Sequence, residues 1–73
     1  MHELPVGSAA RIIAYTAHTA FTERLREFGL IPGTIIKVLR RAPFNGPMEI
    51  QYRSSRIVVR PEETGSIRFE RIW

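Results

Sequence analysis

The amino-acid sequence predicts a mainly β fold: one small barrel of about five antiparallel strands, with one short α-helix between the first and second strands. Three observations predict it. Short segments rich in β-branched and aromatic residues recur along the chain, they are joined by links of hairpin length, and only one segment has helical periodicity. The 73 residues suffice for one small hydrophobic core. We therefore expect a single domain over residues 1–73.

The composition excludes several classes of function. The chain has no cysteine, which removes disulfides, thiolate metal sites and a cysteine nucleophile. It has no aspartate and no glycine-rich phosphate loop, and the paired Glu62 and Glu63 should point apart and be solvated on a helical turn. We therefore expect no enzyme. No apolar run approaches the roughly 20 residues of a membrane span and no signal peptide is visible, so we expect a cytoplasmic protein.

The first strand is predicted over residues 11–15, which are β-branched and aromatic. A helix should follow, because Phe21, Leu25 and Phe28 recur at i, i+4 and i+7 and so lie on one helical face. We expect this face, together with Leu30, to close one open end of the barrel.

The residues at the ends of this helix predict its limits. Thr19 or Thr22 could cap the start, although neither is followed by the Glu or Gln of a full capping box. Gly29 fits the position after the helix, where a left-handed backbone costs glycine nothing, and Leu30 should then contact Leu25. Pro and Gly turn the chain next, so we expect a mainly structural role for Leu25, Gly29, Leu30, Pro32 and Gly33.

Four further strands complete the predicted barrel. They are expected over residues 34–41, 48–53, 56–60 and 66–72. In the second of these, Met48, Ile50 and Tyr52 alternate with polar residues and should face the core. Ser54-Ser55 makes a tight link to the third. Residues 61–65 could form a single helical turn with Pro61 at its first position.

The link between the two central strands, residues 42–47, contains the strongest turn dipeptide of the chain, Asn45-Gly46. Its remaining apolar members are Pro43, Phe44 and Pro47. Apolar residues in an exposed turn are typical of a docking element. The alternative is that Phe44 folds back over the rim of the barrel.

The net charge of +4 leaves open whether the arginines bind a partner. Ten of the eleven basic residues are arginine, which grips phosphate and carboxylate groups, but no run exceeds two, as on an ordinary solvated surface. A nucleic-acid face could be composed of Arg53, Arg56, Arg68 and Arg71 with Tyr52 and Trp73. Because Tyr52 is predicted to face inward, we expect no nucleic acid and keep this function as an alternative.

Two histidines, His2 and His18, are weak candidates for metal ligands, with Glu3 or Glu23 nearby. They lack any H-x3-H or E-x-x-H spacing, and His2 lies at a terminus that we expect to be loose. We therefore expect no built metal cage and no firm cofactor, but at most a transient contact with Fe²⁺ or another divalent ion.

Three motifs resemble one known family. Residues 23–34, ERLREFGLIPGT, resemble the R-L-x-E-x-G-[LI]-x-P-G signature of FeoA-type proteins, which are small cytoplasmic SH3-like barrels associated with bacterial ferrous iron uptake. Residues 41–47 are similar to the Pro-containing loop of that family, and residues 59–64 followed by Ile67 are similar to its ending. Ser54-Ser55 replaces a glycine-containing turn, and Thr64 stands where alanine is common.

The resemblance implies an SH3-like barrel that also occurs as the C-terminal domain of DtxR-type iron-dependent repressors. Those repressors carry a winged helix and a dimerisation region, and because this chain has neither we expect the FeoA function. The resemblance implies that the protein acts as an accessory module on the cytoplasmic side of FeoB, a membrane GTPase-permease. Binding to FeoB would be its only link to the membrane.

From the exposed turn and the motif, the docking residues are predicted to be Arg24, Arg40, Arg41, Pro43, Phe44, Asn45, Gly46 and Pro47. A homodimer through the same apolar loop stays open, since an exposed apolar patch also suits self-association. Besides the nucleic-acid face, a second alternative is a sensor domain responsive to a divalent metal through His18.

Overall fold

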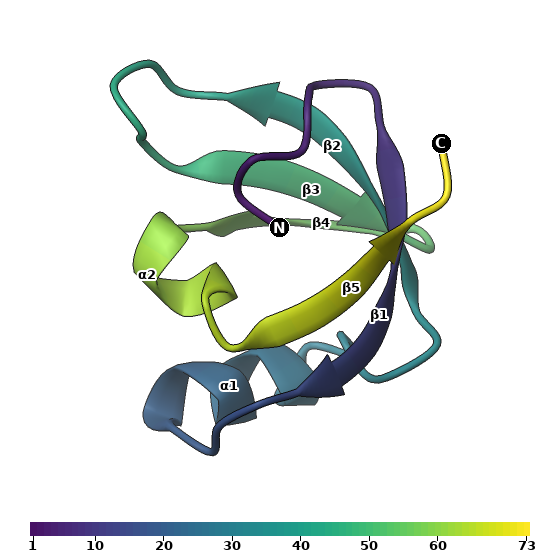
Figure 1. The fold of residues 1–73 in the computed structure, drawn as a ribbon, viewed down its shortest axis with the longest axis vertical. Coiled ribbons are helices and arrows are strands. Elements are labelled where there is room, and N and C mark those ends of the chain that lie inside the picture. The colour runs from purple at the N-terminus through teal and green to yellow at the C-terminus, as the bar shows by residue number, and fades with distance from the viewer.

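The computed structural model describes residues 1–73 and contains five strands and two helices. In chain order the elements are β1 (Ala9–Tyr15), α1 (Ala20–Glu27), β2 (Ile35–Arg41), β3 (Met48–Tyr52), β4 (Ser55–Val59), α2 (Pro61–Thr64) and β5 (Ile67–Arg71) (Figure 1). All strand pairs are antiparallel in one sheet of order β4-β3-β2-β1-β5. The mainly β prediction, with a helix between the first two strands, is confirmed.

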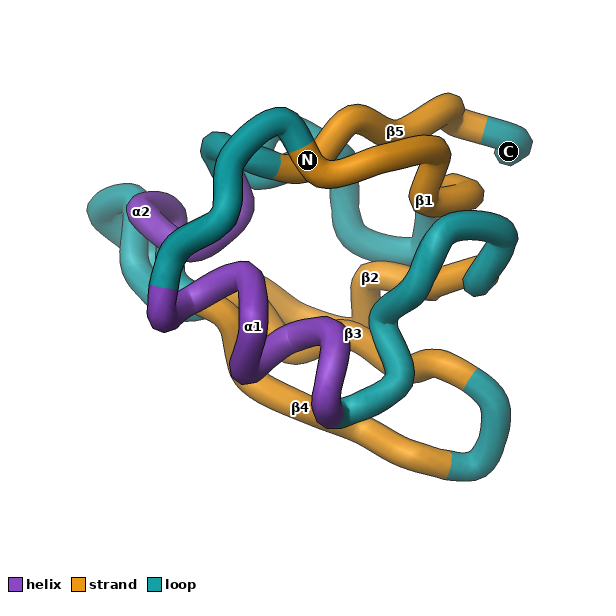
Figure 2. The backbone as a smooth tube through the Cα atoms, turned by 90° about the horizontal axis from the view of Figure 1, so that it is seen from below, coloured by secondary structure: helices purple, strands orange, loops and turns teal.

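The sheet curls so that its two edges border the same interior. Figure 2 shows β1 and β5 on one side and β2, β3 and β4 on the other, with both helices at the open end. β4 and β5 do not pair with each other, and α2 links them. The tight turn into β4 falls on Arg53 and Ser54, one residue earlier than expected, and Arg53 adopts a left-handed φ of 55° there.

One hydrophobic core fills the interior. Its buried members are Met1, Leu4, Ala10, Ile12, Leu25, Leu30, Ile36, Val38, Met48, Ile50, Tyr52, Val59 and Ile67. The inward direction of Met48, Ile50 and Tyr52 is therefore confirmed. The expectation of a loose N-terminus is wrong, because Met1 and Leu4 are buried in this core.

The start of α1 is capped by two threonines. Thr19 is the N-cap, its hydroxyl accepts the Thr22 backbone N–H at 3.2 Å, and the Thr22 hydroxyl accepts the Thr19 N–H at 2.8 Å. This is a full capping box with threonine in the place of glutamate, which corrects the prediction. The buried Thr22 hydroxyl also donates to the Thr19 carbonyl, so burying it leaves no polar group unpaired.

The end of α1 follows the prediction. Gly29 has φ +101°, its N–H donates to the Arg26 carbonyl at 2.9 Å, and the Leu30 N–H donates to the Leu25 carbonyl at 3.1 Å. These two bonds form a Schellman cap. Leu25 and Leu30 are fully buried, so the apolar contact between the last turn and the chain after it lies within the core.

The prediction that this helical face closes the barrel is confirmed for Leu25 and Leu30, which are fully buried. It is wrong for Phe21 and Phe28, because each is about half exposed. Thr22, which was not predicted, is the second helix residue that faces the core. Two tyrosines pack at the same end. Tyr15 donates to the Leu30 carbonyl at 2.6 Å, and Tyr52 donates to the Phe28 carbonyl at 2.8 Å. Tyr15 of β1 and Tyr52 of β3 therefore pack at the end of the barrel where the sequence predicts the phenylalanine rings.

Candidate docking site

The loop between β2 and β3 is a tight turn closed by its own backbone. The Gly46 N–H donates to the Pro43 carbonyl at 3.2 Å, and the Ala42 N–H donates to the Pro47 carbonyl at 2.9 Å. Phe44 and Asn45, the central pair, both have φ +60°. Positive φ at both central positions defines a type I′ turn. The turn therefore centres on Phe44-Asn45, one residue before the predicted Asn45-Gly46.

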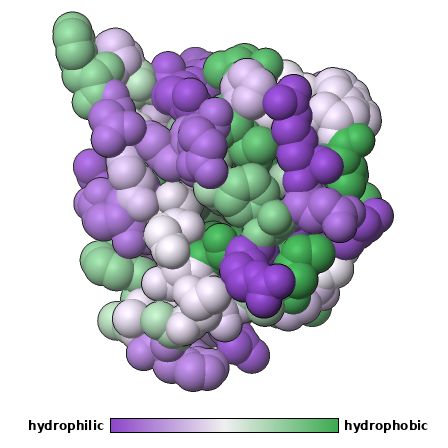
Figure 3. Space-filling view, in the orientation of Figure 1, coloured by the Kyte–Doolittle hydropathy of each residue, from purple (hydrophilic) through white to green (hydrophobic).

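Phe44 projects from the tip of this turn. Its exposed fraction is 99%, so it does not fold back over the rim. In the space-filling view an apolar protrusion stands at the corner occupied by this loop in Figure 1 (Figure 3). A left-handed backbone costs an ordinary L-residue about 1–2 kcal/mol, and the exposed ring returns no core contact. Folding therefore does not explain a phenylalanine at this position.

A pocket of about 370 Å³ lies at the base of the same hairpin. It is lined by Arg40, Arg41, Ala42, Pro47, Glu49 and Val58. Three of the predicted docking residues are thus brought together: Arg40, Arg41 and Pro47. Because Ala42 and Pro47 close the turn that carries Phe44, the aromatic tip and the pocket are neighbouring parts of one surface.

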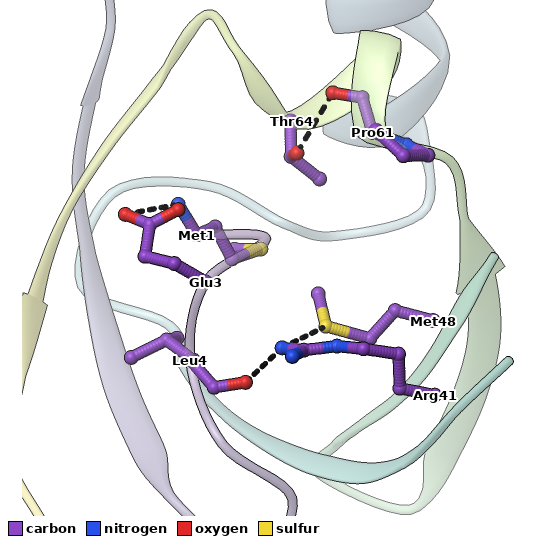
Figure 4. A network of polar contacts seen from close by, with 7 residues as sticks. All are labelled: Met1, Glu3, Leu4, Arg41, Met48, Pro61 and Thr64. Carbon is purple, nitrogen blue, oxygen red and sulfur yellow. Dashed lines mark hydrogen bonds and ion pairs between the residues drawn. The ribbon is translucent and has the colours of Figure 1, made fainter. Parts of the chain in front are cut away.

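The two arginines of the pocket are held in different ways. The Arg40 Nε lies 2.9 Å from a Glu49 carboxylate oxygen, and that arginine is largely exposed. The Arg41 guanidinium donates to the Leu4 carbonyl and lies 3.8 Å from the Met48 sulfur, so it ties the N-terminal segment to β2 and β3 (Figure 4).

No carboxylate neutralises Arg41, and its buried Nε has no hydrogen-bond partner. Two arginines against one glutamate leave the pocket with one excess positive charge. The pocket therefore suits an apolar group that carries an acidic or carbonyl oxygen.

Arg24, the remaining predicted charged contact, lies elsewhere. Its guanidinium pairs with the Glu63 carboxylate and so joins α1 to α2. Glu63 is only 3% exposed, and its other oxygen accepts the Arg60 backbone N–H at 3.0 Å. The expected solvation of this glutamate is wrong, because an arginine and the start of α2 bind it instead.

Two residues of the pocket, Glu49 and Val58, were missed by the sequence analysis. The signal was present, because the alternation that turns Met48 and Ile50 inward turns Glu49 outward. Glu49 stands opposite Arg40 in the sheet, and Val58 stands opposite Glu49. Placing them required the strand register, which the sequence analysis did not predict and which follows from a turn centred on Phe44-Asn45.

The candidate metal ligands do not form a metal site. His18 is exposed, with its Nδ1 3.7 Å from a Glu23 oxygen, and both ring nitrogens of His2 are buried without a hydrogen-bond partner. No group of three or more histidine, aspartate or glutamate side chains is placed to hold an ion. The residues present therefore do not fit a resident metal.

The predicted nucleic-acid face does not form as proposed, because Tyr52 is buried and hydrogen-bonded to the end of α1. As for membrane contact, neither helix has the length and apolar character needed to cross a bilayer.

Comparison with known proteins identifies the family. The model of the FeoA domain matches residues 1–71. The FeoA protein from Chlorobium tepidum is 30% identical, with a TM-score of 0.86 over 99% of this chain and 69% of that one. FeoA from Stenotrophomonas maltophilia, solved with zinc and described as a prokaryotic SH3 domain protein, is 25% identical, with a TM-score of 0.81 over 94% of this chain and 86% of that one.

A manganese-dependent transcriptional repressor shares the fold alone, at 14% identity and a TM-score of 0.81 over 96% of this chain and 39% of the repressor. The predicted likeness to a domain of such repressors is confirmed at that level. No curated protein matches the chain. The family match over nearly the whole length and the similarity to solved FeoA structures show that this chain, with its SH3-like fold, belongs to the FeoA domain family.

Proposed function

We propose that this protein is a non-enzymatic, cytoplasmic accessory module of bacterial ferrous iron uptake, and that it binds the cytoplasmic side of the FeoB transporter-GTPase through the β2–β3 hairpin. One observation carries the proposal: Phe44 is fully exposed in a backbone conformation unsuited to it, beside a positively charged pocket. Family membership supports the pathway, since the Stenotrophomonas maltophilia relative is described as a candidate ferrous iron transport activating factor.

The hairpin offers two kinds of contact. Burying the Phe44 ring in a partner would contribute about 1.5–3 kcal/mol, because the ring starts fully in water. The pocket offers the exposed Arg40 to a carbonyl or carboxylate of the same partner, while Arg41, held by the Leu4 carbonyl, contributes its positive charge. A module that binds one conformation of the GTPase more tightly than another shifts their populations without performing chemistry itself.

The decisive experiment replaces Phe44 with asparagine. Asparagine tolerates φ +60°, so Phe44→Asn should fold and be more stable by about 1 kcal/mol while losing FeoB binding. Thermal unfolding measures the first effect, and retention of detergent-solubilised FeoB on immobilised protein, at low and physiological salt, measures the second. The matched control is Arg53→Asn, which places asparagine at the left-handed φ of 55° in the β3–β4 turn, at the other end of β3, and should retain FeoB.

Two outcomes would overturn the proposal. Undiminished retention of FeoB by a folded Phe44→Asn variant would show that Phe44 is not the docking residue. Failure of the unmodified protein to retain FeoB at either salt concentration would show that FeoB is not the partner.

A further inference from the structure

A line of side chains crosses the outer face of the sheet, away from the β2–β3 loop tip. Lys37 on β2 stands opposite Gln51 on β3, and Gln51 stands opposite Arg56 on β4. Their strand neighbours Ile36 and Ile50 are fully buried, so alternation turns all three side chains outward. Adjacent strands are about 4.8 Å apart, so Lys37 and Arg56 start roughly 10 Å from each other.

Trp73 extends this line beyond β2. Its carbonyl accepts the Ala9 N–H at 2.8 Å, and Ala9 stands opposite Lys37 in the sheet. The Lys37 ammonium lies 5.5 Å from the centre of the indole ring, which is within cation–π range. The indole is 66% exposed. We call the residues Trp73, Lys37, Gln51 and Arg56 the outer row.

No glutamate side chain compensates the positive charge of the outer row. Four of the seven glutamates pair with an arginine or with the N-terminal amine, and Glu23 lies beside His18. None of these partners is Lys37 or Arg56. The other two, Glu27 and Glu62, lie on α1 and α2 and not on this face. An anionic group from outside can therefore approach both cations without displacing a glutamate side chain.

Apolar side chains flank the outer row on the same face. Ile35 is two residues from Lys37 on β2, and Val58 is two residues from Arg56 on β4, and both are about half exposed. Aliphatic flanks suit the apolar side chains of a protein. A nucleic acid would need further stacking surfaces, and Trp73 is the only exposed aromatic residue of the row.

We propose that the outer row is a second docking surface, which adjoins the pocket of the β2–β3 hairpin at Val58. It binds an acidic, amphipathic protein segment by placing its carboxylates on Lys37 and Arg56 and its apolar side chains on Ile35, Val58 and Trp73. Assigning that segment to FeoB rests on the function proposed above. Single exposed ion pairs contribute little, so the contact is weak and salt-sensitive by itself. It strengthens binding when the β2–β3 hairpin already holds the same partner close.

Trp73 supplies the measurement, because it is the only tryptophan of the chain. The probe is a synthetic peptide of alternating glutamate and leucine without tryptophan, titrated against the full chain while indole emission is recorded. We expect a saturable change in emission that weakens as salt rises. Lys37→Glu with Arg56→Glu should lower the affinity on the order of tenfold, because two attractions become repulsions.

The control reverses two arginines elsewhere, Arg26→Glu with Arg68→Glu, on α1 and β5. Each double variant takes the formal net charge from +4 to zero, so overall charge is matched. The control should bind the peptide as the parent does, and thermal unfolding shows that both variants fold. Equal loss in both variants, no emission change with the parent, or tighter binding of an oligothymidylate probe than of the peptide would each overturn the proposal.

Retention of solubilised FeoB separates this proposal from the first. If FeoB is retained through Phe44 but Lys37→Glu with Arg56→Glu changes neither that retention nor peptide binding, the second surface is wrong and the first stands. If the peptide binds the outer row but the parent protein retains no FeoB, the row is a docking surface and its assignment to FeoB, with the proposed function, is wrong.

Discussion

Phe44 and Gly46 lie in the same turn, but only Gly46 suits the position that it occupies. Phe44 has the positive φ that suits glycine or asparagine, whereas Gly46 has no positive φ and is needed for space. A Cβ on Gly46 would lie 2.9 Å from the Ala42 Cβ and 3.0 Å from the Pro43 carbonyl oxygen. The glycine thus shapes the neck of the loop, and the phenylalanine forms the exposed tip that we propose as the docking surface.

This close approach predicts the effect of one methyl group. Gly46→Ala should lower the free energy of unfolding by about 1–3 kcal/mol, because Ala42 or the Pro43 backbone must move. Urea unfolding measures the change. The control is Gly65→Ala, since a Cβ there meets nothing within 4 Å and the backbone φ is −66°. Equal stability of the two variants would contradict the packing argument.

At the scale of elements, α1 and α2 are joined by the Arg24–Glu63 ion pair, in which the glutamate is buried and the arginine is half exposed. Removing the arginine leaves a buried carboxylate with only the Arg60 backbone N–H as its partner. Such an uncompensated charge is costly, while solvent around the exposed arginine screens part of the interaction.

Arg24→Gln should therefore lower the free energy of unfolding by about 1–3 kcal/mol. This is less than the cost of breaking a fully buried ion pair, because the Arg24 side chain is half exposed to solvent. Chemical denaturation measures it, and a double-mutant cycle with Glu63→Gln isolates the pair. Glu62→Gln is the control, because that exposed residue has no ion pair and should change stability by less than about 0.5 kcal/mol. Strict additivity in the cycle would show that the pair does not couple the helices.

The elements differed in how far the sequence predicted them. β3 followed its alternation because one of its faces packs on the core and the other meets solvent. The face of α1 followed its periodicity only at Leu25, because tyrosines of the sheet pack at that end and the two phenylalanines stay half exposed. Periodicity shows which residues share a face, and it does not show which neighbours compete for the space.

For the whole molecule, stability should depend on alkaline pH through Tyr15. Burial raises the pKa of this phenol from its ordinary value of 10.0, against an opposing effect of Arg26. The folded state therefore holds the proton more tightly than the unfolded chain does. The resulting stabilisation is complete below pH 10 and is lost as pH rises through the raised pKa.

Unfolding by urea at about pH 9 and about pH 11 tests this expectation, as the two values bracket the ordinary phenol pKa. The free energy of unfolding should fall between them, and the fall should be smaller in Tyr15→Phe, which has nothing to ionise at this position. That variant also loses the bond to the Leu30 carbonyl, so only the pH slope, and not the absolute stability, bears on the prediction. Identical slopes would contradict it.

Across the whole molecule, the candidate docking site was only partly predictable. The sequence indicated the β2–β3 loop and its arginines through an apolar turn, and the structure adds the pocket that joins Arg40, Arg41 and Pro47 to Val58 of another strand. Arg24 does not line this pocket, because it pairs with Glu63, which lies 39 residues away in the chain. A local turn can be predicted from the residues that form it. Residues that strand register or helix contacts bring together from distant parts of the chain cannot be predicted in this way.

The self-contained closure of the β2–β3 turn has a consequence for how this family diversifies. Because the residues 43–46 are held by two backbone bonds at their own neck, and the Phe44 ring supports no part of the core, the two central positions, Phe44 and Asn45, can vary without disturbing the barrel. Substitutions at these two positions can then alter partner binding while the barrel stays the same. A chimera that carries the corresponding tip of another family member should keep the melting behaviour of this chain and acquire the donor's binding preference.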